Sequence, residues 1–159
     1  MRRFAILLAG LSIAACAPAG NMPQGLQQAE RTALAAAVAN PARSEANRAR
    51  DGFRNPEATL AFFGVRPNQT VVELFPGGGW YSEILAPYVL NGGGTLYVAA
   101  PSERGLAGFR RLVERDHALF GRVRQVTFPV REAGQTGVPA GSADVVLTFR
   151  NVHNWMMGE

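Results

Sequence analysis

The chain has 159 residues, of which 47% are hydrophobic, and a formal net charge of +4. This length and composition predict one domain with a packed core. All of the basic residues are arginines, and they are scattered along the chain without interleaved aromatic residues, so the sequence gives no indication of nucleic-acid binding. The single cysteine, Cys16, excludes an internal disulfide and a cysteine-based metal cluster, and no metal site is expected.

The first residues have the composition of an export signal. Arg2 and Arg3 precede an apolar run over residues 4–11, which is too short to span a bilayer as a helix. Residues 13–16 read Ile-Ala-Ala-Cys, which resembles the bacterial lipobox, in which the cysteine is acylated and becomes the mature N-terminus. The resemblance implies a lipoprotein-type signal peptide over residues 1–15 and a lipid anchor on Cys16 that holds the protein at the membrane, on the periplasmic side of the cell envelope. An ordinary signal peptide followed by an incidental cysteine is the alternative.

Residues 16–50 are predicted to form a tether and an N-terminal helix. Proline and glycine are frequent up to residue 25, as in a flexible segment. The alanine-rich stretch 26–39 then predicts a helix that ends before Pro41. Residues 44–50 have room for one or two further helical turns.

Residues 51–159 alternate between helical and strand patterns. Asn55 is expected to cap a helix that starts at Pro56 and ends at Gly64. Apolar stretches predict strands over 70–74, 95–99, 123–128 and 144–149, with helices over 80–91 and 104–120 and a loop over 129–142 between them. This alternation predicts an α/β fold with a parallel, doubly wound sheet.

The most informative segment joins the first strand to the helix that follows it. Pro76 and the three glycines at 77–79 forbid regular structure, and a glycine loop between a strand and a helix lets a ligand touch the backbone. A tight turn that needs glycine only for its dihedral angles is the alternative. Glu73 lies inside the apolar strand, where a carboxylate needs partners, and the loop amides are expected to supply them.

The pattern Glu73-x-Phe75-x-Gly77-x-Gly79 resembles the first motif of class I S-adenosylmethionine (SAM) dependent methyltransferases. That motif runs acid-x-Gly-x-Gly-x-Gly at the end of the first strand, so Phe75 departs from it. The resemblance implies a SAM site whose cofactor-binding residues include Glu73, Phe75, Gly77, Gly78, Gly79 and Trp80. An NAD-type loop would instead have Gly-x-Gly-x-x-Gly and no acid in the strand, which fits this segment less well.

Two glutamates are candidates for contacts to the nucleoside part of such a cofactor. The second strand ends at residues 99–101 without the acid that SAM and NAD proteins place there for the ribose hydroxyls. Glu103 is the nearest carboxylate, and a role in the first turn of the next helix is favoured for it. Glu132 lies 12 positions before Asp144, a spacing at which many class I methyltransferases place a residue that meets the adenine amino group; a solvated loop glutamate is the alternative.

Residues 144–155 resemble the fourth methyltransferase motif, in which Phe-Asp-x-Val is followed by a histidine. Side chains just past the carboxyl end of a parallel strand face the ligand crevice, so Arg150, Asn151, His153 and Asn154 are expected there. Asn151 and His153 are the catalytic candidates, with His153 as general base, and Arg150 and Asn151 are expected to contact the cofactor. The alternative is that these polar side chains only satisfy backbone groups at a strand–helix junction.

Together these segments resemble a family of predicted, often exported, bacterial methyltransferases. The resemblance implies a Rossmann-like parallel sheet and methyl transfer from SAM to a small-molecule or unknown acceptor. Class I methyltransferases typically have seven strands in the order 3-2-1-4-5-7-6, so residues 51–159 are expected to be the N-terminal part of such a domain, with only the first four strands present. The alternatives are a non-catalytic envelope lipoprotein on a degenerate methyltransferase fold, and another Rossmann protein with an NAD-type cofactor.

Replacing Cys16 by alanine tests the lipid anchor. The Cys16→Ala protein should accumulate as an unprocessed precursor, because the residue that is acylated before cleavage is gone. Mass spectrometry of the wild-type protein from the membrane fraction should find a lipidated Cys16 at the N-terminus. An unmodified Cys16 in that fraction would contradict the anchor.

Overall fold

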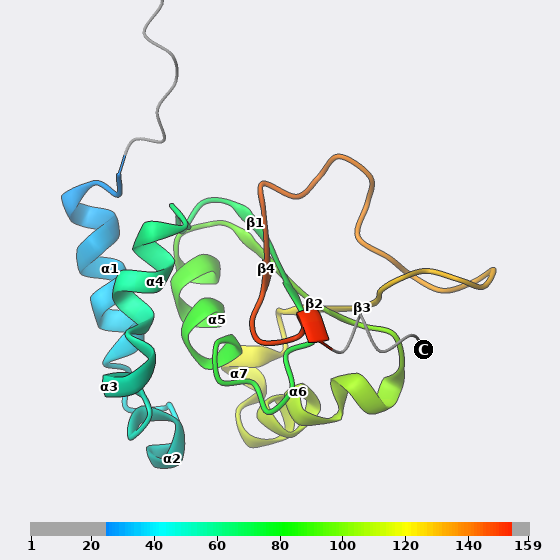
Figure 1. Cartoon of the computed structure of the whole chain (residues 1–159), viewed down its shortest axis with the longest axis horizontal. Helices are drawn as coiled ribbons and strands as arrows, with labels where there is room; N and C mark the ends of the chain where they lie inside the picture. The colour runs from blue at the N-terminus through cyan, green and yellow to red at the C-terminus, as the bar shows by residue number, and fades with distance from the viewer. Residues whose placement is uncertain (1–24, 154–159) are drawn as a thin grey trace, which may run out of the picture.

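The structure, a computed structural model, describes residues 25–153 (Figure 1). The predicted signal peptide over residues 1–15, Cys16 and the residues up to 24 lie outside the described residues, as does Asn154. The described elements, in chain order, are α1 (Gln28–Val38), α2 (Glu45–Arg48), α3 (Asp51–Arg54), α4 (Pro56–Phe62), β1 (Thr70–Leu74), α5 (Ser82–Asn91), β2 (Thr95–Ala100), α6 (Glu103–Arg115), α7 (His117–Phe120), β3 (Arg124–Thr127) and β4 (Val145–Thr148).

The strands form one parallel sheet in the order β3-β2-β1-β4. Val72 of β1 pairs with Tyr97 of β2 on one side and with Val146 of β4 on the other. The predicted α/β fold with a Rossmann-like parallel sheet is therefore confirmed. The strand order reverses between β1 and β4, and in open parallel sheets ligands bind beyond the carboxyl ends of the strands at such a reversal.

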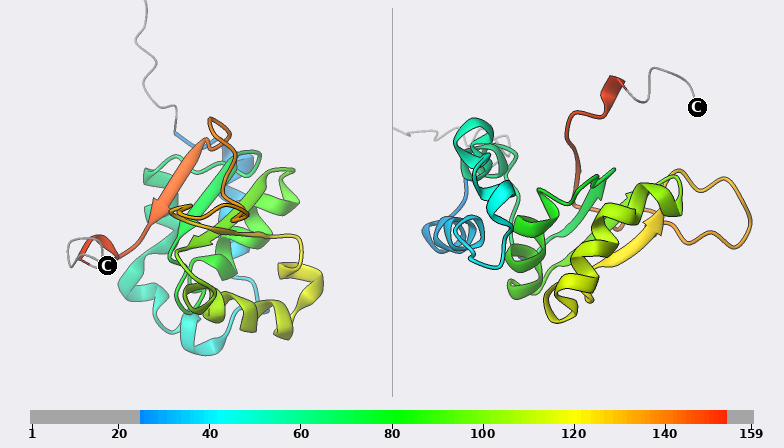
Figure 2. Two further views of the ribbon diagram at one scale, coloured as in Figure 1. Left: turned by 90° about the vertical axis from the view of Figure 1, so that its right-hand side faces the viewer. Right: turned by 90° about the horizontal axis from the view of Figure 1, so that it is seen from below.

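The helices lie on one face of the sheet and build the main core with it (Figure 2). Side chains alternate between the two faces along each strand, so Val71 lies in this core, whereas Val72 and Tyr97 lie in a second cluster on the opposite face. In the described part of the chain, Phe75 and Val138 pack against the second cluster and no helix does. Within residues 25–153, the expected doubly wound arrangement is thus replaced by a one-sided helical layer.

A buried carboxylate attaches the N-terminal helices to the sheet layer. Glu83 of α5 is 1% exposed and accepts hydrogen bonds from the backbone N–H of Ser44 at 3.2 Å and from the side-chain amide of Asn47 at 2.9 Å. Arg115 of α6 forms an ion pair with the same carboxylate at 2.7 Å. Because a buried carboxylate is tolerated only with such partners, this network fixes the residues around α2 against α5 and α6.

Local details differ from the sequence-based expectations. The helix expected over residues 104–120 is two helices, because Asp116 leaves the helical conformation and its carboxylate accepts a hydrogen bond from the N–H of Leu119 in α7. Asn55 precedes α4 as expected, but its φ is 43° and its side chain makes no capping bond. The four-residue helix α3 was not expected, since it is too short to have an apolar period, and α5 begins at Ser82 rather than at Trp80.

Among residues 25–153, no helix is both long and apolar enough to cross a bilayer.

Candidate functional site

The loop after β1 has a left-handed backbone at three alternate positions. The φ angles are 56° at Phe75, 56° at Gly77 and 80° at Gly79. A left-handed conformation costs a residue with a side chain about 1–2 kcal/mol, whereas glycine adopts it readily. Phe75 therefore has the backbone conformation that glycine would adopt at the first position of the acid-x-Gly-x-Gly-x-Gly pattern, and its departure from that pattern concerns the side chain.

The same loop rests on α6 and leaves one edge open. A Cβ atom at Gly79 would overlap Leu112 of α6, and a Cβ atom at Gly108 of α6 would overlap the carbonyl oxygen of Gly77. Gly77 and Gly78 are exposed, and a Cβ atom at either would meet no atom within 4 Å. Gly79 and Gly108 thus permit close packing, while Gly77 and Gly78 leave room for a ligand against the backbone.

Glu73 lies beneath the loop rather than in it. Its side chain is 3% exposed, and its Oε2 atom accepts a hydrogen bond of 2.6 Å from the hydroxyl of Ser82 at the start of α5. Burial raises the pKa of Glu73 to about 7, and the hydrogen bond from Ser82 lowers it by less than burial raises it. The hydrogen bond that the structure gives this carboxylate comes from Ser82 and not from the loop amides that were expected to donate. The burial indicates that Glu73 supports the loop from below.

Asn151 connects the end of β4 to the end of β1. Its side-chain nitrogen lies 3.5 Å from the carbonyl oxygen of Leu74, 3.4 Å from that of Phe75 and 3.4 Å from the hydroxyl of Thr148. The side-chain amide can donate to two of these acceptors at once. Of the residues expected at the crevice after β4, Asn151 is therefore the one that the structure brings against the glycine loop. The preceding residue, Arg150, has a φ of 62°, so strained backbone occurs on both sides of this junction.

The side chain of Trp80 is buried and is held by contacts to the N-terminal helical region. Its indole is 5% exposed, and its Nε1–H donates a hydrogen bond of 2.8 Å to the backbone carbonyl of Asn47. The guanidinium carbons of Arg54 and Arg43 lie 4.7 Å and 5.6 Å from the centre of the ring. These contacts occupy the indole, so the part of Trp80 that borders the loop is its backbone.

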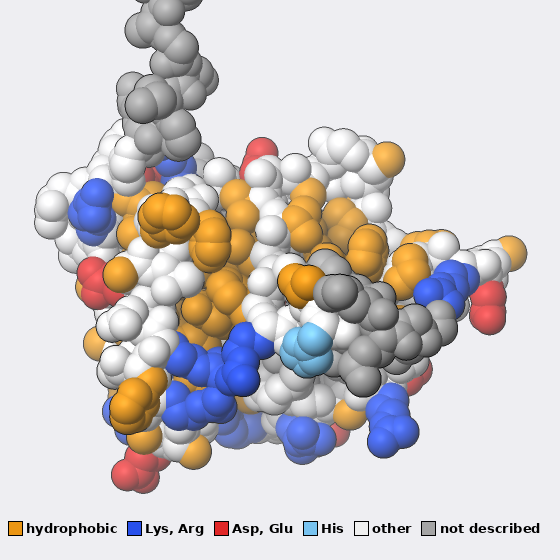
Figure 3. Space-filling view, viewed as in Figure 1, with side chains coloured by type: hydrophobic (Ala, Val, Ile, Leu, Met, Phe, Trp, Pro, Cys, Tyr) orange, Lys and Arg blue, Asp and Glu red, His pale blue; other side chains and the backbone are white. Residues whose placement is uncertain are grey.

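Arginine side chains gather beside Trp80 and the β4 junction. Burial lowers the pKa of Arg54, and the positive charges of Arg50 and Arg150 lower it further. None of these three arginines forms an ion pair with another described residue. Figure 3 shows arginine side chains collected on this face, below a band of hydrophobic side chains. The carboxyl edge between β1 and β4 is therefore electropositive.

The two glutamates considered for the nucleoside lie elsewhere. Glu132 is exposed in the loop after β3, and its carboxylate has no hydrogen-bond or ion-pair partner among residues 25–153. Glu103 forms an ion pair with Arg110, about two helical turns further along α6. It also lines a cavity of about 350 Å³ together with residues of β3 and of the loop after it. The favoured role of Glu103 as an acid in the first turn of α6 agrees with this ion pair.

His153 is exposed at the end of the described residues.

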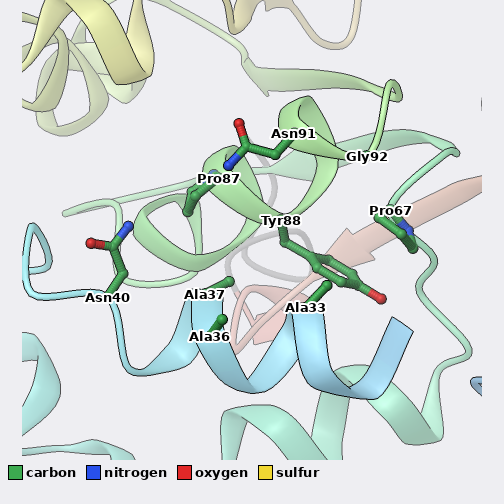
Figure 4. Close-up of a pocket in the computed structure, with 9 residues that line it drawn as sticks. All are labelled: Ala33, Ala36, Ala37, Asn40, Pro67, Pro87, Tyr88, Asn91 and Gly92. Atoms are coloured by element: carbon green, nitrogen blue, oxygen red, sulfur yellow. The ribbon is translucent and has the colours of Figure 1, made fainter. Parts of the chain in front are cut away.

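Another cavity, of about 330 Å³, lies between α1 and α5 (Figure 4). Its lining consists mainly of alanine and proline, and the residues are Ala33, Ala36, Ala37, Asn40, Pro67, Pro87, Tyr88, Asn91 and Gly92. The hydroxyl of Tyr88 already donates a hydrogen bond of 3.0 Å to the carbonyl of Val65. Pro67 and Gly92 precede β1 and β2, so this cavity lies at the amino end of the sheet, away from the predicted crevice.

In residues 25–153, no three side chains of His, Cys, Asp or Glu are grouped so that they could hold a metal ion.

Sequence reasoning missed the partners of the two buried glutamates and the arginine cluster. A carboxylate at position 83 within the apolar run of α5 was a usable signal, because such a residue needs buried partners. The gathering of Arg50 and Arg54 with Arg150 had no such signal, since about a hundred residues separate the two groups in the sequence.

Two substitutions of Phe75 isolate the strain in the loop. Phe75→Ala and Phe75→Gly both remove the same ring, so they lose the same packing against the second cluster. The glycine variant should be more stable than the alanine variant by about 1 kcal/mol, because only alanine retains the left-handed penalty, which exceeds the extra chain entropy of glycine. Urea denaturation of both variants measures this difference. Equal stability, or a more stable alanine variant, would contradict a left-handed residue 75.

The raised pKa of Glu73 predicts a stability that depends on pH. The folded protein keeps this proton up to about pH 7, whereas the unfolded chain loses it near pH 4.5. The contribution of Glu73 to the free energy of unfolding is therefore fully present below pH 4.5 and falls as the pH rises to about 7, by up to about 3 kcal/mol. Glu73→Gln keeps the shape of the neutral acid and should remove this decline. Denaturation curves at about pH 5 and about pH 8 that change equally for both proteins would contradict the shift.

Comparisons with known proteins leave the family open. No family model and no curated protein matches the chain. Among solved structures, the chain is similar to the X-ray structure of YjhP from E. coli, with 18% sequence identity and a TM-score of 0.39. The similarity covers 79% of this chain and 46% of that chain, so this chain spans about half the length of YjhP. The strand order β3-β2-β1-β4 and the parallel register define the fold.

Proposed function

We propose that this chain contains the cofactor-binding part of a SAM-dependent methyltransferase whose acceptor is a small molecule or is unknown. The observation that carries the proposal is the loop after β1. A buried acid at position 73 precedes left-handed backbone at positions 75, 77 and 79, and the peptide units of Gly77 and Gly78 are open to a ligand. This loop lies next to the strand-order reversal between β1 and β4, where ligands of parallel sheets bind.

The residues present fit a cofactor at the loop and depart from the usual pattern at the ribose. Gly77 and Gly78 offer a cradle that a Cβ atom would begin to fill, and Asn151 and Arg150 lie at the adjoining end of β4. The end of β2 reads Ala-Ala-Pro and offers no carboxylate. Binding of the ribose would then depend on backbone groups. Without a carboxylate for the ribose hydroxyls, we expect a lower affinity for the cofactor than in methyltransferases that have one.

The chemistry follows from what each component supplies. SAM supplies an electrophilic methyl group, and the chain has to hold the acceptor close to it and in line. Asn151 is proposed to orient the reactants, because its amide is fixed on the carbonyl oxygens after β1. His153 is proposed to accept the proton of the acceptor as a general base.

Each alternative function has one observation in its favour or against it. The absence of an acid at the end of β2 favours a non-catalytic envelope protein on a degenerate methyltransferase fold. The acid at position 73 within β1 disfavours an NAD-type Rossmann protein, whose loop starts from a strand without one. The lipid anchor on Cys16 and the periplasmic location are part of the proposal and rest on the sequence of residues 1–16.

Gly78→Val tests whether the open edge of the loop holds a cofactor. The new side chain points into open space and the backbone there is not left-handed, so the fold should be unaffected. Affinity for SAM should fall at least about tenfold, because the side chain occupies the space next to the exposed peptide units. Calorimetric titration with SAM, S-adenosylhomocysteine and NAD measures this for the wild type and the variant. Gly79→Val is less suitable, because its side chain would overlap Leu112 of α6 and would disturb the packing of the loop whether or not a cofactor binds there.

Gly52→Val is the matched control. Gly52 also faces open space with an ordinary backbone conformation, but it belongs to α3 and not to the loop. It should leave SAM affinity unchanged. The proposal is wrong if the wild-type chain binds none of the three compounds, or if it binds NAD in preference to SAM; unchanged SAM affinity in Gly78→Val would mean that the loop is only a turn.

A further inference from the structure

We propose that Arg50, Arg54 and Arg150 form a subsite for the phosphate or carboxylate group of an acceptor that also has an apolar body. The identification of this ligand as the acceptor rests on the proposed methyltransferase function; the anion subsite itself rests on the geometry of these side chains. The arginines come from α3, from the residue before it and from the end of β4, so the fold and not the local sequence assembles them.

The surrounding structure holds the side chain of Arg54 and the backbone next to Arg150. Arg54 stacks on the ring of Trp80 at 4.7 Å, and the hydrogen bond from that ring to Asn47 fixes the ring itself. Arg150 precedes Asn151, whose side chain is held on the carbonyl oxygens after β1. Arg54 is therefore held against Trp80, and Arg150 lies at the end of β4, next to the residue that contacts the loop after β1.

Asp51 and the two buried glutamates are already paired with other groups. Asp51, which lies between two of the arginines in the sequence, makes a bidentate ion pair with Arg43 at 2.7 Å and 2.8 Å. The buried Glu83 pairs with Arg115, and Glu73 accepts its hydrogen bond from Ser82. Arg50 and Arg150 consequently lie near Arg54, and none of the three forms an ion pair with a carboxylate of residues 25–153.

A bound anion would relieve the repulsion among these cations. Arg50 and Arg150 lower the pKa of Arg54, which is the expected effect of like charges held close together. Guanidinium groups match phosphate and carboxylate oxygens with paired N–H donors, so a bound anion would convert the repulsion into charge-assisted hydrogen bonds.

A row of aromatic rings leads away from the arginines and suits an apolar body. Tyr81 stacks on Phe149 with ring centres 3.6 Å apart, Phe149 lies 6.3 Å from Phe63, and Phe63 lies 5.5 Å from Phe62. Phe62 and Phe63 are 85% and 50% exposed, respectively. Hydrophobic side chains form a band above the arginines in Figure 3. A ligand with one anionic end and one apolar end would cover both surfaces.

Titration of the full chain with small anions, at constant ionic strength and without SAM, tests the subsite. Phenyl phosphate should bind at least about fivefold more tightly than inorganic phosphate, because its ring covers apolar surface that phosphate leaves exposed. Benzoate against phenyl phosphate distinguishes a carboxylate end from a phosphate end, and binding of either supports the subsite. Failure of both aromatic anions to bind overturns it, and equal affinity for phenyl phosphate and inorganic phosphate overturns the apolar part.

Variants locate the binding. Arg150→Asn removes a charge from an exposed residue and suits the left-handed backbone there, because asparagine tolerates that conformation. It should weaken phenyl phosphate binding about three- to tenfold, and Arg54→Gln should weaken it by about tenfold. Arg122→Gln removes the same charge just before β3, at the opposite edge of the sheet, and should leave the affinity unchanged. An equal loss in Arg122→Gln would indicate general attraction by a basic protein and would overturn the subsite.

Competition with SAM separates this inference from the proposed function. Phenyl phosphate should bind with or without saturating SAM, because the acceptor and the cofactor occupy different places. If SAM does not bind but the anion binds at the three arginines, the proposed function is wrong and the anion subsite stands. If SAM and phenyl phosphate exclude each other, the arginines belong to the cofactor site and the acceptor subsite is wrong.

Discussion

The left-handed turn that follows β1 is the constraint on which the rest of the site depends. By reversing the chain within a few residues, it returns α5 onto the sheet and sets the hydroxyl of Ser82 on the buried carboxylate of Glu73. The same turn places Gly77 against Gly108, so α6 can pack directly on the loop. A side chain at Gly108 would overlap the carbonyl oxygen of Gly77, and one at Gly79 would overlap Leu112, so these two glycines are what lets the loop and α6 share one core. The tolerance for Phe75 shows that the surrounding packing is strong enough to hold one strained residue.

The N-terminal helices are part of the site and do not only connect it to an anchor. The network around Glu83 fixes α2 against α5 and α6. The indole of Trp80, on which Arg54 stacks, is held in turn by its hydrogen bond to the carbonyl of Asn47. α1 packs on α5 in the same core. As a result, residues that precede the sheet in the sequence contribute the positive charge at its carboxyl edge.

The candidate site has two chemically different sides. On one side, the glycine loop offers an open backbone and a buried acid below it, while the end of β2 offers no carboxylate for a ribose. On the other side, arginines and aromatic rings dominate. A cationic cofactor such as SAM would be repelled by these arginines, and an anionic acceptor between them would offset that repulsion. Under the proposed function, this charge distribution favours an acceptor that is itself negative.

The sequence by itself determined the α/β class, the strands, the glycine loop and the place of Glu73, because each depends on short-range patterns: apolar runs, glycine spacing and a charge within a strand. It also placed Asn151 at the carboxyl end of the sheet, where the structure brings it to the carbonyl oxygen of Phe75, since the residues after a parallel strand have a known location. The tertiary structure alone decided that the described helices cover one face, that Ser82 rather than the loop amides contacts Glu73, and that Trp80 is held by structural contacts. It also decided that Arg150 lies close enough to Arg54 to lower its pKa, because the proximity of residues far apart in a chain follows from the packing of whole elements, which no local pattern encodes.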